Sequence, residues 1–337
     1  MRMSYRTRRR LQRFGVAMLI LILALALFAG GYLLWIDRYI YYTRDGAVLD
    51  MDLPPISDDG VLAEPPKKEK PVTIYYDDGE SDETNKELTQ LVGYYIDAEQ
   101  LTDIPTVRQQ LQALPSGTPI MIDVKSIYGN FYYSSSVTES RNSNIDTKAM
   151  DELLAYLDQS GFYLIARMPA LRDKEYGLAH DEDGVFHSSR GYLVMDDDGC
   201  YWLNPGREGT INHIVRAIKE LKALGFDEVV LSDFAFPDMD NIYVGGDKTE
   251  LITNAAKTLV DTCGTDTFAV SFVGNADFPL PEGRTRLYVT SSAASEAATI
   301  AQETGFETPQ IHLVFLTENH DTRFNNYGVM RPLSSAH

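Results

Sequence analysis

The chain has 337 residues, of which 44% are hydrophobic, and its formal net charge is −19. This length can hold a membrane anchor, a linker and one domain of about 250 residues. The acidic balance argues against nucleic acid as a partner, because phosphate binding needs a basic surface. The two cysteines, Cys200 and Cys263, form no CxxC pair, so no zinc site is expected and no other metal or cofactor is predicted.

The N-terminal region predicts a membrane anchor. Six arginines occur in residues 1–13, and the next 23 positions, 14–36, carry no charge. About 20 apolar residues span a bilayer as a helix, and flanking arginines favour the cytoplasmic side. We therefore expect a cytoplasmic basic tail at 1–13, a single transmembrane helix at 14–36 in the plasma membrane, and an extracellular C-terminal domain. A cleaved signal peptide is the alternative, but the apolar run is long for one.

Residues 37–88 read as a linker between this helix and a domain at 89–337. The stretch carries the proline pairs 54–55 and 65–66 and the mixed-charge run 67–70. Such a composition buries little apolar surface and stays extended or loosely ordered. It would hold the domain away from the membrane.

From residue 89 onward, short apolar runs alternate with helix-like stretches. A series of this kind predicts a parallel sheet with helices outside it. Seven strands are readable and an eighth is weak, which favours a (β/α)8 TIM-like barrel over an open doubly wound sheet. The expected strands are 91–97, 119–124, 162–167, 228–233, 268–273, 286–290, 310–316 and, weakly, 326–330. The expected helices are 107–114, 147–160, 209–224, 249–263 and 295–304. No phosphate-binding glycine motif is present.

The cysteines occupy different kinds of junction in this pattern. Cys200 lies in a strand-to-helix loop, and Cys263 lies where a helix leads into a strand. In a parallel α/β domain these junctions lie at opposite ends of the sheet. Two free thiols are therefore expected, although an extracellular domain would also permit a disulfide.

Polar residues follow the carboxyl ends of the predicted strands, which meet at one mouth of a barrel. These residues are Asp97, Asp123, Lys125, Arg167, Asp233, Asn275 and Glu318. Asp123 and Lys125 share a strand face, so they form either a structural ion pair or a site in which the lysine tunes an acid or binds a hydroxyl. Arg167 needs a partner at the end of an apolar strand, and Asp233 is the candidate on the neighbouring strand.

Aromatic residues occur in the loops on the same side of the predicted barrel. Tyr128, Trp202 and Phe236 are placed to stack on sugar rings, although ordinary packing explains any one of them equally well. The acidic turn at 196–199 resembles part of a calcium loop. It lacks the alternating ligands of an EF-hand, so an exposed hairpin turn is expected.

Four segments, in fixed order, resemble the DUF4015-type glycoside hydrolases, a TIM-barrel group related in fold to α-amylase-like enzymes. PIMIDVKSIYGNFYY (119–133) is similar to the family's IDVKDxxG strand, and FYLIARMPALRDKEYGLAH (162–180) is similar to its ARI strand with a following Asp. GCYWLNP (199–205) is similar to its WxDP turn. GFDEVVLSDFAFP (225–237) is similar to its GFDEIQFDYVRFP. The resemblance covers roughly residues 90–320.

The chain departs from the family pattern at positions where the family has charged or polar functional residues. The family's Asp falls on Ser232, its Tyr on Asp233 and its Arg on Ala235. A slip of one residue along a strand turns a side chain to the other face, so either a local bulge returns Asp233 to the mouth or the carboxylate has moved. The acid of WxDP is replaced by Asn204.

The resemblance implies a membrane-anchored extracellular glycoside hydrolase that acts on a polysaccharide or cell-wall glycan by a two-carboxylate mechanism. Asp233 and Asp123 are the expected catalytic carboxylates. The expected substrate-binding residues are Lys125, Arg167, Asp97, Glu318, Tyr128, Trp202 and Phe236. The alternative is a non-catalytic glycan-binding or envelope-associated barrel that has lost hydrolase residues. A partner of another surface protein is a third reading.

Overall fold

A computed structural model describes residues 40–43, 46–49, 88–138, 144–188, 191–291 and 293–335. The chain divides into two compact units, Met1–Ser81 and Asp82–His337. In the first unit, β1 (Ile40–Thr43) and β2 (Gly46–Leu49) pair as an antiparallel ribbon within the stretch expected to be a linker. The expected tail at 1–13 and transmembrane helix at 14–36 lie outside the described residues. Within the described part of the chain, no helix combines the length and apolar character that a membrane span needs.

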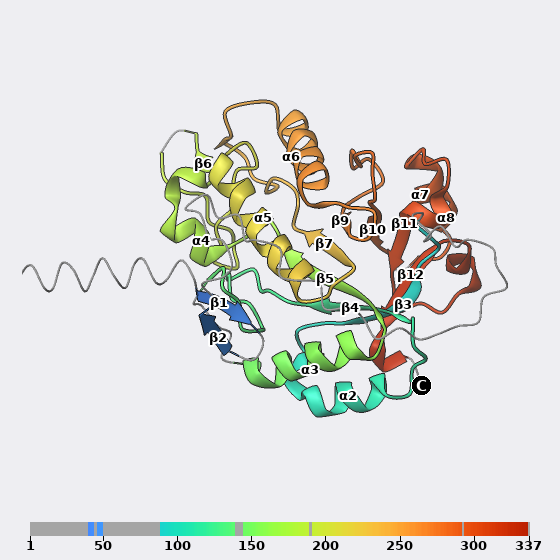
Figure 1. Ribbon diagram of the computed structural model, residues 1–337. Helices are drawn as coiled ribbons and strands as arrows, with labels where there is room; N and C mark the ends of the chain where they lie inside the picture. Colours follow the sequence, from blue (N-terminus) through green and yellow to red (C-terminus); the bar gives the residue numbers. More distant parts are fainter. Residues whose placement is uncertain are drawn as a thin grey trace, which may run out of the picture. The chain divides into compact units, whose positions relative to one another are not determined.

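The second unit contains a closed barrel of eight parallel strands, which confirms the predicted (β/α)8 architecture (Figure 1). The strands lie around the barrel in the order β10-β11-β12-β3-β4-β5-β7-β9. Their bounds are β3 Val92–Ile96, β4 Pro119–Asp123, β5 Tyr163–Pro169, β7 Glu228–Ser232, β9 Ala269–Val273, β10 Leu287–Thr290, β11 Leu313–Leu316 and β12 Gly328–Pro332. The weak eighth strand of the sequence is β12, which closes the barrel between β11 and β3.

Helices surround the strands. The α-helices are α2 Ile104–Leu111, α3 Thr147–Gln159, α4 Lys174–Ala179, α5 Glu208–Ala223, α6 Lys248–Cys263, α7 Ala297–Glu303 and α8 Pro309–His312. The 3-10 turns are η1 Gln100–Asp103, η2 Asp181–Asp183, η3 Thr322–Asn326 and η4 Leu333–Ser335. Two short strands, β6 Phe186–His187 and β8 Ile242–Tyr243, pair with each other and join the loop after β5 to the loop after β7.

Element boundaries differ from the expected ones where a cap or a proline decides them. Helix α2 begins three residues earlier than predicted, because Asp103 caps it by accepting a hydrogen bond from the Thr106 N–H and Pro105 occupies the first turn. Strand β11 begins at Leu313 rather than 310, because Pro309 starts the short helix α8.

The apolar pattern of the chain explains both layers of the core. Helix α5 buries Ile214, Ile218 and Leu221, whose three- and four-residue spacing places them on one face of the helix. A separate cluster, which includes Met121 and Val230, is made by residues from the barrel strands. Both cysteines are buried and free, as predicted.

The segment GFDE at 225–228 closes the amino end of the barrel. Gly225 has a left-handed φ of +92° after the end of α5, where a Cβ would meet the side chain of Asp158. Phe226 is buried, and the Asp227 carboxylate accepts a hydrogen bond of 2.9 Å from the Leu164 N–H. These contacts fix the turn from α5 into β7. Gly225, Phe226 and Asp227 therefore have structural roles.

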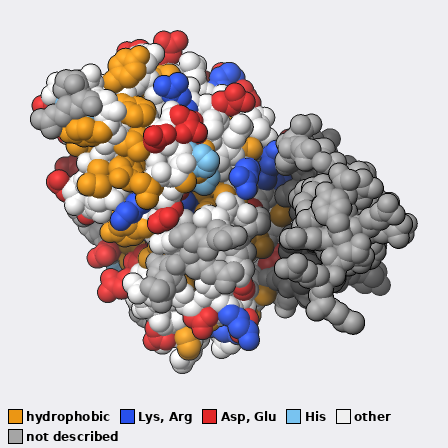
Figure 2. All heavy atoms as spheres, turned by 90° about the vertical axis from the view of Figure 1, so that its left-hand side faces the viewer, with side chains coloured by type: hydrophobic (Ala, Val, Ile, Leu, Met, Phe, Trp, Pro, Cys, Tyr) orange, Lys and Arg blue, Asp and Glu red, His pale blue; other side chains and the backbone are white. Residues whose placement is uncertain are grey.

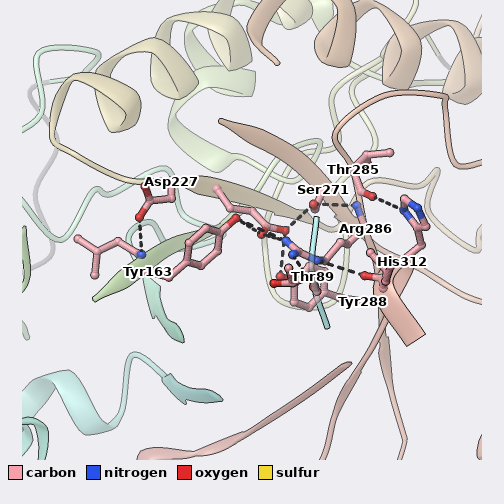
Figure 3. Close-up of polar contacts among 11 residues, drawn as sticks. Thr89, Tyr163, Asp227, Ser271, Thr285, Arg286, Tyr288 and His312 are labelled. Atoms are coloured by element: carbon pink, nitrogen blue, oxygen red, sulfur yellow. Dashed lines mark hydrogen bonds and ion pairs between the residues drawn. The ribbon is translucent and has the colours of Figure 1, made fainter. Parts of the chain in front are cut away.

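Glu228 is the centre of a buried polar network at the same end. Its carboxylate forms an ion pair with Arg286, and the two side chains are 0% and 2% exposed. Its hydroxyl donors are Tyr163 at 3.0 Å, Ser271 at 2.6 Å and Tyr288 at 2.9 Å. Figure 3 shows the partner side chains pointing toward one another: Tyr163, Ser271, Arg286 and Tyr288. Because it joins β5, β7, β9 and β10 away from the strands' carboxyl ends, the network is part of the scaffold.

Candidate active site at the carboxyl mouth of the barrel

Asp123 and Arg167 end up side by side at the carboxyl ends of β4 and β5. The strand register places them directly opposite each other. The guanidinium of Arg167 donates from Nε to Asp123 Oδ1 at 2.5 Å and from Nη2 to Oδ2 at 2.9 Å, and the Ala98 N–H also donates to Oδ2 at 3.1 Å. The expectation that Arg167 pairs with Asp233 is therefore wrong. The register favours Asp123, which is on the adjacent strand at the same level.

The surroundings of this pair include two further predicted residues. Asp97 follows β3 and accepts a hydrogen bond of 2.9 Å from the Gln100 N–H, which opens η1. Burial raises the pKa of Tyr95, and the charges of Glu318 and Asp97 raise it further, so both carboxylates act on the same region. Glu318 itself is exposed. Asp97, Asp123, Arg167 and Glu318 thus belong to one part of the mouth.

Lys125 does not pair with Asp123. Its ammonium lies 2.6 Å from Asp173 Oδ2 and donates to the Pro169 carbonyl at 3.2 Å. The side chains of Lys125 and Asp173 are 3% and 1% exposed, so the pair is fully buried. Lys125 is therefore a buried cation of the site and offers little surface to a substrate.

Asp173 and His213 are absent from the site residues predicted from the sequence, although Asp173 is the Asp that follows the ARI-like strand in segment 162–180. Asp173 accepts a hydrogen bond from the Tyr176 N–H at the start of α4, and its other oxygen lies 3.3 Å from His213 Nε2. The ring of His213 stacks on Tyr176, with 4.0 Å between centroids. Burial alone would raise the pKa of Asp173, but the charges of Lys125 and His213 outweigh it and lower the pKa. Burial lowers the pKa of His213 below its ordinary value, although the hydrogen bond with Asp173 opposes this shift.

A sequence signal for these two residues exists in retrospect. His213 interrupts the apolar face of the helix that contains Ile214 and Ala217, and a polar side chain on such a face needs a buried partner. Asp173 stands directly before α4 as its N-cap. Neither signal says which residue the side chain meets.

Asp233 leaves β7 in a left-handed conformation, with φ of +49°. β7 ends at Ser232, so the alternation of faces along the strand does not extend to Asp233. A non-glycine residue in this region is strained, and such strain is common at functional sites. The shift of the carboxylate by one residue is thus accompanied by a change of backbone conformation rather than by a bulge within the strand.

The Asp233 carboxyl is half-buried and accepts a hydrogen bond of 3.2 Å from Ser232 Oγ. Among the residues that the structure describes, it forms no ion pair. Burial raises its pKa above the ordinary value of 3.8; Ser232, Arg172 and Lys125 oppose this effect, and the charge of Asp196 adds to it. Asp233 therefore holds its proton to a higher pH than an exposed aspartate does.

The acidic turn forms the expected hairpin and holds an arginine. Met195 and Tyr201 bridge as antiparallel partners across the turn. Arg172 donates from Nε to Asp196 at 2.6 Å and from Nη2 to Asp198 at 2.5 Å. Trp202 donates its indole N–H to Asp196 at 2.9 Å, and the Arg172 guanidinium lies 5.6 Å from its ring centre. The acidic turn therefore fixes the side chain of Arg172, which lies just after β5.

The other predicted aromatics differ in exposure. Tyr128 is 42% exposed, and the ammonium of Lys174 lies 5.8 Å from its ring centre. Phe236 is half-buried and packs against the main core. Figure 2 views the molecule from the side of α4 and β6 and shows hydrophobic and acidic side chains gathered on this face. Exposed hydrophobic residues of α4 and of the loops after β5 and β7 include Leu178, Tyr192, Met195, Met239 and Tyr243.

Two cavities lie elsewhere. One, of about 360 Å³, is bordered by Tyr94, Leu114 and Arg331. The other, of about 640 Å³, is bordered by Thr265, Glu282 and His312, which precede β9, β10 and β11. None of the predicted site residues lines either cavity. The candidate site is an arrangement of side chains at the strand ends, outside both cavities.

The family model of DUF4015, described as a "putative glycosyl hydrolase domain", matches residues 93–263 of the chain. The chain belongs to the DUF4015 family. The match begins in β3 and ends at the last residue of α6, so it contains Asp97, Asp123, Lys125, Arg167 and Asp233. The family predicted from the four sequence segments is confirmed.

The first of three similar solved structures supports the barrel fold of this DUF4015 member. A GH36 α-galactosidase from Geobacillus stearothermophilus in complex with raffinose is 12% identical, with a TM-score of 0.51; the match covers 74% of this chain and 40% of that one. A hypothetical protein from Ruminiclostridium thermocellum is 17% identical, with a TM-score of 0.46 over 53% of this chain and 96% of that one. A GH20 β-N-acetylglucosaminidase from Vibrio harveyi is 11% identical, with a TM-score of 0.46 over 68% and 41%. The chain thus spans about two fifths of the two named glycosidases. A comparison with curated proteins gave no match.

Proposed function

We propose that the barrel domain hydrolyses the glycosidic bonds of a polysaccharide, with Asp233 as proton donor and Asp123 as the second carboxylate. The family supports a glycosidase-like activity. The observation that carries the assignment is the state of Asp233, a half-buried carboxyl after a barrel strand with no ion-pair partner among the described residues and a raised pKa. A glycosidase needs a carboxyl group that is protonated when the bond to the leaving sugar breaks.

Asp123 suits the second role because it is held in place. Both of its oxygens accept hydrogen bonds from Arg167, and one also accepts from the Ala98 N–H. A fixed carboxylate stabilises the positive charge that develops on the sugar ring, or directs the attack that completes hydrolysis. Arg167 orients this carboxylate, and Asp97 and Glu318 add negative charge around it.

Two aromatic side chains, Tyr128 and Trp202, are the candidates for sugar binding at the site. Tyr128 is the most exposed of the three predicted aromatics, and Trp202 is fixed by Asp196 and Arg172. Aromatic faces combine apolar area with fixed geometry, which suits stacking on sugar rings. We assign substrate contact to Tyr128 and Trp202, and assign to the buried Lys125 an effect through charge. The proposed anchor at 14–36 would hold the domain on the outer side of the plasma membrane, facing cell-wall glycans.

A glycan-binding protein without hydrolase activity is the second candidate. The observation that favours it is Asn204, which takes the place of the acid in the family's WxDP turn. Its side chain donates to the Val244 carbonyl at 3.0 Å and accepts from the Gly206 N–H at 2.9 Å, so it connects two loops. A residue with this structural role supplies no carboxylate.

The test is release of reducing ends from a panel of neutral, acidic and amino-sugar polysaccharides by the purified full-length chain. Asp233→Asn and Asp123→Asn should each lose at least about 100-fold in rate, the usual contribution of a positioned acid or base. The matched control is Asp261→Asn, an exposed aspartate of α6 paired with Lys257. Full activity of both site variants on a substrate that the wild type cleaves would refute the assignment. Binding of a glycan without cleavage would support the second candidate.

A further inference from the structure

Two cations border Asp233, and each is already bound by another carboxylate. Lys125 lies 2.6 Å from Asp173 and is buried with it. Arg172 is held by Asp196 at 2.6 Å and by Asp198 at 2.5 Å. Neither cation forms an ion pair with Asp233.

The backbone shows how close these groups are. Lys125 donates to the carbonyl of Pro169, and Pro169 is the register partner of Ser232, the residue before Asp233. The Ala170 N–H then donates to the Ser232 carbonyl at 2.9 Å, and Arg172 follows two positions later. The charges of both cations lower the pKa of Asp233, which agrees with this placement.

The pairing of each cation with its own carboxylate influences the pKa of Asp233. An unoccupied lysine or arginine within about 4–6 Å of a carboxylate lowers its pKa by roughly 1–3 units and keeps it ionised. Here each cation is paired with a carboxylate of its own, and the opposite charge of that carboxylate reduces the attraction between the cation and Asp233. The burial of Asp233 then outweighs the remaining attraction, and the pKa is raised.

We propose that Asp173 and Asp198 are positioning residues, which hold Lys125 and Arg172 away from Asp233 so that Asp233 can serve as the proton donor. This inference rests on the proposed function of Asp233. The charged and titratable groups around Asp233 come from four segments other than β7. They are Lys125 after β4, Arg172 and Asp173 after β5, and Asp196 and Asp198 in the hairpin turn, with His213 of α5 behind Asp173.

The test titrates the Asp233 carboxyl directly, by carbon NMR of the full-length chain labelled at aspartate carboxyls. The Asp233→Asn spectrum assigns the signal. In Asp173→Asn, the Lys125 ammonium loses its partner and turns toward Asp233, so the Asp233 midpoint should fall by about one pH unit. Asparagine keeps an oxygen for the Tyr176 N–H, so the cap of α4 is retained. In Asp198→Asn a smaller fall in the same direction is expected.

Asp197→Asn is the matched control, since Asp197 is an exposed residue of the same turn and contacts neither cation. It removes the same charge and should leave the midpoint unchanged. If the midpoint in Asp173→Asn is no lower than in Asp197→Asn, the inference is wrong. Should Asp173→Asn fail to fold, Asp198→Asn decides by the same comparison, because Asp198 is 63% exposed.

The titration needs no substrate, so its outcome is separate from that of the activity assay. A lowered midpoint in a chain that cleaves no glycan supports the positioning role and refutes the hydrolase. An unchanged midpoint in an active enzyme refutes the positioning role and leaves Asp233 as its acid. In an active enzyme, a lowered midpoint also moves the basic limb of the pH–rate profile to lower pH, because the donor must be protonated.

Discussion

Asp123 and Arg167 face each other across β4 and β5 and share two hydrogen bonds, of 2.5 and 2.9 Å. Their side chains are 16% and 23% exposed, so the pair is partly shielded from water. The arginine is therefore committed to Asp123 on one side of β5, and Asp233, which follows β7 on the other side, is left without it. This division separates a fixed carboxylate, Asp123, from Asp233, whose pKa is raised by burial.

Arg167→Met should destabilise the domain by about 1–3 kcal/mol. Removal of one partner leaves the Asp123 carboxylate half-buried and unpaired, and water at the mouth reduces the cost below that of a fully buried pair. Urea denaturation measures the change. Arg167→Lys should lower the unfolding free energy by less, because it keeps the positive charge and loses only the bidentate hydrogen bonding. Equal losses in the two variants would contradict the role given to this geometry.

Glu228→Gln should be more damaging to stability, by about 3–5 kcal/mol, because it leaves Arg286 charged at 2% exposure with no anion. Urea denaturation measures this change in unfolding free energy as well. Asp261→Asn, which breaks the exposed pair with Lys257, should change stability by less than about 1 kcal/mol. A similar small change in Glu228→Gln would show that the network at the amino end of the barrel is not a scaffold element.

The barrel could be predicted because its strands are continuous apolar runs between amphipathic helices, and burial on both faces demands that pattern. The partners in the site could not. Whether Arg167 meets Asp123 or Asp233 depends on the strand register, which apolar runs do not determine. Asp173 has the sequence signature of a helix cap, and its contact with Lys125 arises only when the loops after β4 and β5 fold together.

Asp233→Asn should stabilise the fold at neutral pH while it removes activity. Because the folded-state pKa of Asp233 lies above its ordinary 3.8, the ionised carboxylate is less stable in the fold than in the unfolded chain. This cost is fully present above the folded-state pKa and absent below the unfolded one. Asparagine also tolerates the left-handed conformation. We expect a gain of about 0.5–2 kcal/mol at pH 7 that shrinks at pH 3.5. A loss at pH 7 would contradict the assignment.

His213 should make stability fall as the solution becomes mildly acidic. Its pKa in the fold lies below the ordinary 6.5, so the unfolded chain binds the proton first. The stabilisation is present above 6.5 and is lost as pH falls toward the folded-state pKa. His213→Gln should therefore flatten the dependence of unfolding free energy on pH between 7 and 5. The exposed His320 provides the control, since His320→Gln should leave the wild-type slope.

The role of Asp233 as proton donor is tested most directly by the leaving group. The rates of wild type and Asp233→Asn are compared on a natural glycan and on the matching dinitrophenyl glycoside, whose leaving group departs without protonation. We predict that Asp233→Asn loses at least about 100-fold on the glycan and keeps most of the wild-type rate on the dinitrophenyl substrate. Equal losses on both substrates would contradict the assignment of Asp233 as the acid.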